Sequence, residues 1–149
     1  MLTMRIGEDY AEELHTINAA YRGGRQGFRT TEVCCADVFG RKISFSKHHD
    51  VPLEMARLMD VFAAEFDSTD DIPAIALCFA RFFYAFIAIH PFRDANRRTA
   101  FAFMENRSRE KSCDIHSINV LRRVLLEGDV AAEMQKLRSL FITMLKPQL

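Results

Sequence analysis

The fold of this chain is decided by the stretch Ile87-Ala88-Ile89-His90-Pro91-Phe92-Arg93-Asp94-Ala95-Asn96-Arg97-Arg98-Thr99-Ala100. An apolar segment runs into His90. Pro91 predicts that this helix ends there, because proline lacks a backbone N–H and disfavours α geometry in the residue before it. A second helix is expected to begin near Asn96 or Arg97. Residues 90–98 would then form the loop that joins the two helices.

Two side chains of this loop carry reactive or metal-binding groups. His90 stands at a helix end, where an imidazole titrates near neutral pH and can serve as a general base. Asp94 offers the hard oxygen ligand that Mg²⁺ uses when it bridges one carboxylate to substrate phosphates. The alternative is a plain helical corner with a capping acid, a buried histidine and surface arginines. This alternative explains any one of these residues better than a functional site does, but it explains the whole set in this order less well.

The start of the second helix is predicted to bind phosphate. The first amides of a helix lack intrahelical partners, and the helix dipole attracts anions. The amides in question belong to Ala95, Asn96 and Arg97. Arg98, with Arg93 or Arg97 as further candidates, can neutralise the charge that develops as a phosphate bond breaks.

The string H-P-F-R-D-A-N-R-R-T-A-F resembles the Fic family signature, H-P-F-x-[D/E]-G-N-G-R-x-x-R. The resemblance implies an all-α fold, a Fic-type helical bundle with a small β-hairpin flap. It also implies an enzyme that moves AMP from ATP, with Mg²⁺, onto a hydroxyl of a target protein. The family's motif assigns roles to these positions: His90 as base, Asp94 as Mg²⁺ ligand, Asn96 with its neighbours Ala95 and Arg97 as anion hole, Arg98 as phosphate contact, and Phe92 as core anchor.

Three positions depart from that signature. Ala95 and Arg97 replace the two glycines, and Phe101 replaces the last arginine. Alanine is a mild change at position 95 only if φ is negative there, because alanine at positive φ is strained. All three changes point toward the Doc branch, whose motif reads D-A-N-K-R-T-A-L and which phosphorylates its target, whereas H-P-F is of the Fic type. The branch therefore stays open.

Three functions remain as hypotheses. The first is AMP transfer to a Ser, Thr or Tyr hydroxyl of a target protein. The second is Doc-like phosphoryl transfer to a protein Ser or Thr. The third is a catalytically inactive Fic-fold binding module. The inhibitory pattern [S/T]-x-x-x-E-[G/N] of many Fic proteins is absent, so the resemblance implies either a separate antitoxin-like inhibitor chain or no such control.

A second resemblance lies upstream, in residues 21–29 followed by Val33, which is similar to the Gly…Arg…Val run that leads to the Fic flap. Extended segments are expected at Val33–Val38 and Lys42–Phe45, so residues 32–46 would form a β-hairpin. In the family this flap docks the target segment as an added strand. A hairpin that only covers the core is an equal alternative. The docking residues would be Val38, Phe39, Gly40, Arg41 and Lys42.

Helical patterns fill most of the remaining chain. They are expected at 7–21, from Pro52 to Phe66, at 72–89, from the motif to Asn106, from Ser117 to Leu126, and from Asp129 to just before Pro147. The segment 72–89 is long and apolar enough to suggest a membrane span. Arg81 argues against insertion, because arginine at the centre of a span costs about 2.5–3.5 kcal/mol. We expect this segment to be the central helix of a bundle instead, with Asp71 as its N-cap and Pro73 in its first turn.

Composition limits the remaining possibilities. The 149 residues favour one domain over 1–149, and 49% apolar with 27% charged residues is ordinary for a globular protein. A formal net charge of zero argues against a nucleic-acid partner. No signal peptide is visible, and the four cysteines lack zinc spacing, so we expect reduced thiols. The location is expected to be cytoplasmic, with a secreted bacterial effector as the alternative.

Overall fold

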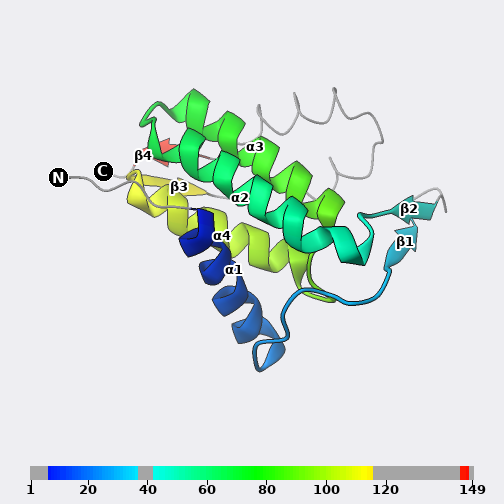
Figure 1. Ribbon diagram of the computed structural model, residues 1–149. Helices are drawn as coiled ribbons and strands as arrows, with labels where there is room; N and C mark the ends of the chain where they lie inside the picture. The colour runs from blue at the N-terminus through cyan, green and yellow to red at the C-terminus, as the bar shows by residue number, and fades with distance from the viewer. Residues whose placement is uncertain (1–6, 37–41, 116–144, 148–149) are drawn as a thin grey trace.

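The computed structural model describes residues 7–36, 42–115 and 145–147, and its body is a bundle of four helices (Figure 1). The elements follow in the order α1 (Gly7–Arg22), β1 (Cys34–Ala36), β2 (Lys42–Ser44), the 3₁₀ turn η1 (His48–Asp50), α2 (Val51–Asp67), α3 (Ile72–Ile89), α4 (Asn96–Glu110), β3 (Cys113–Ile115) and β4 (Leu145–Pro147). The prediction of a helical bundle is confirmed.

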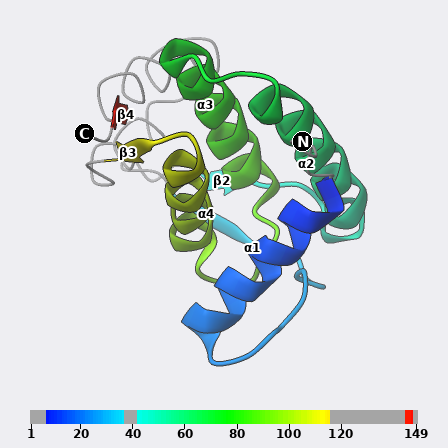
Figure 2. The same ribbon diagram turned by 90° about the vertical axis from the view of Figure 1, so that its left-hand side faces the viewer.

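The four helices pack in a closed arrangement around one core. Helix α1 contacts both α2 and α4, α2 packs against α3, and α3 packs against α4. Figure 2 shows α1 crossing between α2 and α4. The corner between α3 and α4 therefore lies within reach of the last turns of α1.

The core is an aromatic cluster to which all four helices contribute. Phe62 of α2 lies at its centre, with ring centroids 5.2–5.6 Å from Tyr10, Phe66, Phe82 and Phe103. These rings are at most 2% exposed. Because aromatic side chains bury large areas and prefer offset-stacked or edge-to-face contacts, such a cluster fixes the helices relative to one another.

Helix α3 starts and ends where the sequence signals predict. Asp71 caps it, since its carboxylate accepts from the Ala74 N–H at 3.1 Å, and a proline stands in the first turn. Its length and composition would allow it to cross a membrane, but 56% of it is buried inside the protein. Arg81 extends to the surface and pairs with Glu65 of α2 at 3.2 Å. Core packing therefore accounts for the apolar sequence of α3.

Four short strands form two small antiparallel pairs. Strands β1 and β2 pair with Cys35 opposite Ile43, within the segment predicted as a hairpin. The turn between them, with the predicted docking residues Val38, Phe39, Gly40 and Arg41, lies outside the described residues. Of that set only Lys42 is described, as the first residue of β2. The flap and its docking role stay predictions.

The C-terminal part of the chain differs from the sequence prediction in one place. Leu145–Pro147 form strand β4, paired antiparallel with β3, although the apolar spacing predicted that a helix reaches Leu145. Leu145 lies opposite Ile115 in this register. The predicted helices over 117–126 and 129–144 lie outside the described residues.

Helix α1 approaches α2 closely at its first residue. A Cβ atom on Gly7 would lie 2.8 Å from the Asp60 backbone nitrogen and 2.9 Å from the Met59 carbonyl carbon. Real Cβ atoms do not reach such distances to backbone, so the two helices would have to separate.

We therefore expect Gly7→Ala to lower the free energy of unfolding by about 1–3 kcal/mol, as overpacking does in other cores. At an open helical position the same change would stabilise the helix. Urea denaturation at pH 7 measures the effect, with Thr16→Ala on the exposed face of α1 as the control. An unchanged or increased free energy of unfolding for Gly7→Ala would contradict the predicted close approach.

Candidate functional site

The loop between α3 and α4 begins with a left-handed residue. His90 has φ 54° and ψ 61°, and its backbone N–H still donates to the Phe86 carbonyl at 2.8 Å. The right-handed α conformation is disfavoured before a proline, so the helix cannot continue through Pro91. The sequence predicted the end of the helix at this residue but not its left-handed backbone.

A buried arginine from the α1–β1 connection caps the end of α3. The Arg29 side chain donates from Nε to the His90 carbonyl at 2.6 Å and from Nη2 to the Ile89 carbonyl at 3.0 Å. The last carbonyls of a helix lack intrahelical partners and lie at the negative end of its dipole, so a guanidinium group suits them. Sequence reasoning missed this role, because residue 29 is about 60 positions from its partners.

The His90 ring stacks on the ring of Phe45, with centroids 4.0 Å apart and planes 14° from parallel. Burial lowers the pKa of His90 to about 4, and the positive charges of Arg29 and Arg97 act in the same direction. The imidazole is therefore neutral at pH 7 and able to accept a proton. Phe45 was not among the predicted site residues.

Asn96 shapes the loop with its side chain. Its Oδ1 accepts from the Phe92 N–H at 2.9 Å, and its Nδ2 donates to the Phe92 carbonyl at 2.8 Å. Both residues are buried, and Phe92 is fully so, as expected for a core anchor. The Asn96 amide side chain is therefore used within the protein. The predicted anion hole depends on backbone groups at this position.

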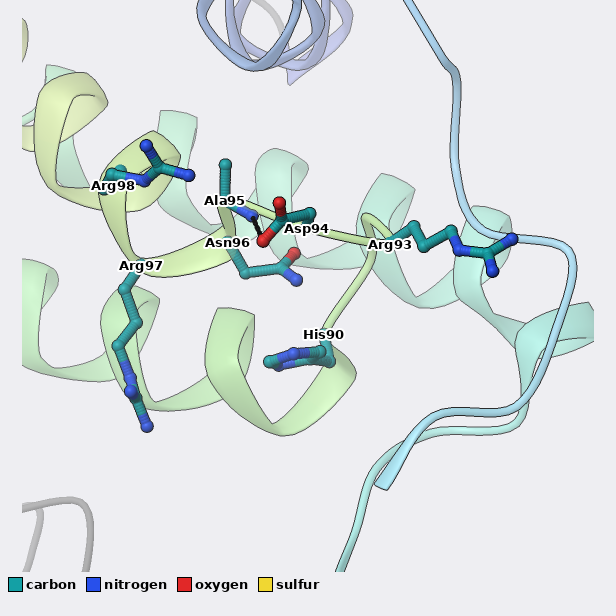
Figure 3. A pocket seen from close by; sticks show the side chains of 7 residues that line it. All are labelled: His90, Arg93, Asp94, Ala95, Asn96, Arg97 and Arg98. Carbon is teal, nitrogen blue, oxygen red and sulfur yellow. Dashed lines mark hydrogen bonds between the residues drawn. The ribbon is translucent and has the colours of Figure 1, made fainter. Parts of the chain in front are cut away.

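Asp94 and Ala95 form the lip of the loop. The Asp94 Oδ1 accepts from the Ala95 N–H at 2.8 Å, which leaves the second carboxylate oxygen at the exposed lip (Figure 3). Ala95 has φ 63° and ψ 25°. The condition under which alanine would be a mild replacement for glycine is not met, and the left-handed backbone costs about 1–2 kcal/mol here.

The residues predicted to bind phosphate line a cavity. An open hollow of about 320 Å³ is lined by His90, Arg93, Asp94, Ala95, Asn96, Arg97 and Arg98, which includes every residue predicted for catalysis, metal and phosphate. Three guanidinium groups and one carboxylate give it an excess of positive charge. Figure 3 shows Arg93 extending away from the other labelled side chains. The hollow thus suits an anion that bears several negative charges.

Helix α1 contributes a contact that the sequence did not suggest. The Arg98 guanidinium carbon lies 5.0 Å from the ring centroid of Tyr21, in the last full turn of α1. Tyr21 is 44% exposed, so the pair stands at the surface beside the hollow. A cation–π contact of this kind favours this position of the Arg98 charge, by about 0.5–1 kcal/mol at an exposed site. Asn18 of α1 also binds the loop, donating to the Asp94 carbonyl at 3.0 Å.

The fold and the site together define a helical protein with a positively charged hollow at the start of a helix and a histidine in its lining. The model of the Fic/DOC family matches residues 5–106, about two thirds of the chain. The chain belongs to the Fic/DOC family. No curated protein matches it.

Solved Fic structures share the fold at low sequence identity. The N-terminal Fic domain of a cell filamentation protein from Bartonella quintana, a VirB-translocated Bep effector, is 18% identical with a TM-score of 0.71, covering 93% of this chain and 71% of that one. BepC from Bartonella tribocorum, with bound AMPPNP, is 16% identical with a TM-score of 0.70, covering 91% and 74%. An ADP-bound Fic domain from B. quintana is 16% identical with a TM-score of 0.65, covering 95% and 85%.

The lowered pKa of His90 predicts a pH dependence of stability. An unfolded histidine titrates near 6.5, whereas folded His90 titrates near 4, so between these values the unfolded chain binds more protons. The free energy of unfolding therefore rises with pH in this window, and the contribution present above pH 6.5 is lost as the pH falls toward 4.

His90→Gln should reduce this dependence. Urea midpoints at pH 5 and pH 7 should differ less in the variant than in the wild type, and His49→Gln controls for loss of an exposed imidazole. Some pH dependence of the free energy of unfolding should remain in the variant, because burial also lowers the pKa of His15. An equal difference between the pH 5 and pH 7 midpoints in the wild type and in His90→Gln would show that His90 is not buried as described.

Proposed function

We propose that this protein transfers AMP from ATP to a Ser, Thr or Tyr hydroxyl of a target protein. The observation that carries the proposal is a neutral imidazole, a carboxylate and the first amides of a helix around one positively charged hollow. Membership of the Fic/DOC family supports it. The AMPPNP and ADP bound to the two similar Bartonella structures also support a nucleotide ligand.

In the proposed reaction His90 acts as general base. Its ring accepts the proton of the target hydroxyl while the hydroxyl oxygen forms a bond to the α-phosphorus of ATP. The bond from that phosphorus to the bridging oxygen of the β-phosphate breaks, and pyrophosphate leaves. The amides of Asn96 and Arg97 and the cation of Arg98 would hold the phosphates in line and stabilise the developing charge, whereas the Ala95 N–H already donates to Asp94.

The residues present fit a magnesium ion bound with the nucleotide. Mg²⁺ usually takes one or two carboxylates together with substrate phosphates and water, and Asp94 has one carboxylate oxygen not used by the Ala95 N–H. Among the described residues no group of three His, Cys, Asp or Glu side chains is placed to hold a metal. Asp94 would therefore hold the ion only with phosphate. The ion would neutralise phosphate charge during transfer.

Phosphoryl transfer is the second candidate, because the last arginine of the Fic signature has no counterpart here. Phe101 takes that position, is 6% exposed, and belongs to the hydrophobic core. Arg97 stands where the signature has its second glycine. Both features resemble the Doc motif, in which the target oxygen would attack the γ-phosphorus and ADP would leave.

The partners remain proposals. We propose that the target presents its hydroxyl beside the β1–β2 segment, as the family flap implies. An antitoxin-like inhibitor chain is a further proposed partner. A non-catalytic binding module is the outcome that would remain if no group were transferred.

Two labelled forms of ATP distinguish these reactions. The protein is incubated in lysate with Mg²⁺ and ATP labelled on either the α- or the γ-phosphate. AMP transfer places the α-label on protein, and phosphoryl transfer places the γ-label there. His90→Gln should lower the transfer rate by about 10²- to 10⁴-fold, the usual range for loss of a general base. His49→Gln, which changes an exposed histidine, should keep the wild-type rate. Transfer of neither label would overturn the proposal.

Asp94→Asn tests the magnesium assignment separately. The asparagine Oδ1 can still accept from the Ala95 N–H, so the loop should keep its shape while the ligand charge is lost. Calorimetric titration with ATP should show that Mg²⁺ strengthens binding to the wild type and no longer does so in Asp94→Asn. Asp70→Asn, at an exposed acid bound to Lys111, is the control. An Mg²⁺ effect of wild-type size in Asp94→Asn would remove Asp94 from the metal site.

A further inference from the structure

Arg29 joins three separate segments of the chain through one buried guanidinium group. Its side chain is surrounded by carbonyl oxygens, and the residue is 5% exposed. Beyond the two bonds that cap α3, Nη1 donates to the Thr31 carbonyl at 2.9 Å and Nη2 donates to the Ser46 carbonyl. The Arg29 backbone N–H donates to the Pro91 carbonyl at 2.9 Å.

These partners are the two ends of the β1–β2 segment and the end of α3. Thr31 precedes β1, and Ser46 follows β2. The Ser46 N–H also donates to the Ala88 carbonyl at 3.2 Å, and the ring of Phe45 stacks on the ring of His90. The segment that contains the strand pair is therefore tied at both ends to the residues that carry the histidine.

Lysine cannot make the same set of bonds. The guanidinium is a planar fork with five N–H donors, and here three of its nitrogens serve four carbonyl oxygens in different directions. The lysine ammonium is a single point charge with three donors at the end of a flexible four-carbon stem. A lysine at position 29 would therefore keep the positive charge but lose the hydrogen bonds to the four carbonyl oxygens.

We propose that Arg29 is a positioning residue of the transfer reaction: it fixes both ends of the β1–β2 segment to the last carbonyls of α3 and so holds the His90 ring against Phe45 at the hollow. Arg29 does not line the hollow itself and acts through the backbone. The expected effect of Arg29 on the transfer rate rests on the proposed function. The positioning of His90 does not.

The positioning is tested by NMR of the free protein. The nearly parallel ring of Phe45 should shift the signals of the His90 ring protons through its ring current. Phe45→Leu removes this ring-current shift and so identifies the His90 signals. Loss of the Arg29 bonds should let the His90 ring move away from Phe45. Arg29→Lys and Arg29→Met should therefore shift these His90 signals in the direction seen for Phe45→Leu. Arg25→Lys and Arg25→Met change an exposed arginine of the same connection that pairs with Glu12, and they should leave these signals in place.

The kinetic arm separates positioning from binding. Arg29→Lys should lower kcat roughly 10- to 100-fold, because small misplacements of a reacting group have effects of this size. The dissociation constant for ATP with Mg²⁺ should change less than about threefold, since Arg29 lies outside the hollow. A loss of ATP affinity as large as the loss of kcat would make Arg29 a binding residue and overturn the proposal.

A folding failure of both Arg29 variants would still leave a decisive measurement on the wild type. The Arg29 Nε–H, buried and bonded to the His90 carbonyl, should exchange with water much more slowly than the Arg25 Nε–H. Equal exchange rates, or His90 signals that stay unchanged in a folded Arg29 variant, would overturn the proposal. Absence of transfer by the wild type would count against the proposed function alone, because the NMR arms need no turnover.

Discussion

The abrupt end of α3 is the constraint on which the site depends. A buried apolar helix has carbonyl groups at its end that water does not reach, and an unsatisfied buried carbonyl is costly. The guanidinium of Arg29 satisfies two of them, at Ile89 and His90. With those groups bonded, the chain can turn through a left-handed residue directly into Pro91. The histidine and the start of α4 are thereby brought to one hollow.

Local signals in the sequence were sufficient to place both ends of α3 and the start of α4, although α4 continues to Glu110, beyond the predicted Asn106. Asp71 and the following proline predicted the start of α3, Pro91 predicted its end, and α4 begins at Asn96 as expected. Each of these signals acts on backbone groups within four residues, so its effect on the backbone conformation can be inferred from the sequence. The bond of Arg29 to His90 and the contact of Tyr21 with Arg98 join residues 61 and 77 positions apart. Only the packed tertiary structure brings such groups together, so spacing along the chain cannot reveal them.

Ala95 shows how the loop keeps its shape without the glycine of the family signature. Its left-handed backbone costs about 1–2 kcal/mol in a residue with a Cβ atom. The two bonds between Asn96 and Phe92 are buried, and each such bond contributes about 1 kcal/mol. These contributions are of the same size as the strain. The sequence singled out position 95 as one where the sign of φ decides the strain, and the sign itself had to come from the structure.

The charges of the hollow connect ligand binding to base strength. A neutral His90 with a pKa of about 4 can accept a proton, yet it is a weaker base than the reaction would use best near neutral pH. Part of the lowering comes from the cation of Arg97, which faces the hollow. A polyphosphate bound there would offset that charge and raise the pKa, while the effect of burial would remain. In the proposed reaction the cation of Arg97 would thus attract the nucleotide and also add to the lowering of the His90 pKa, of which burial is the larger cause.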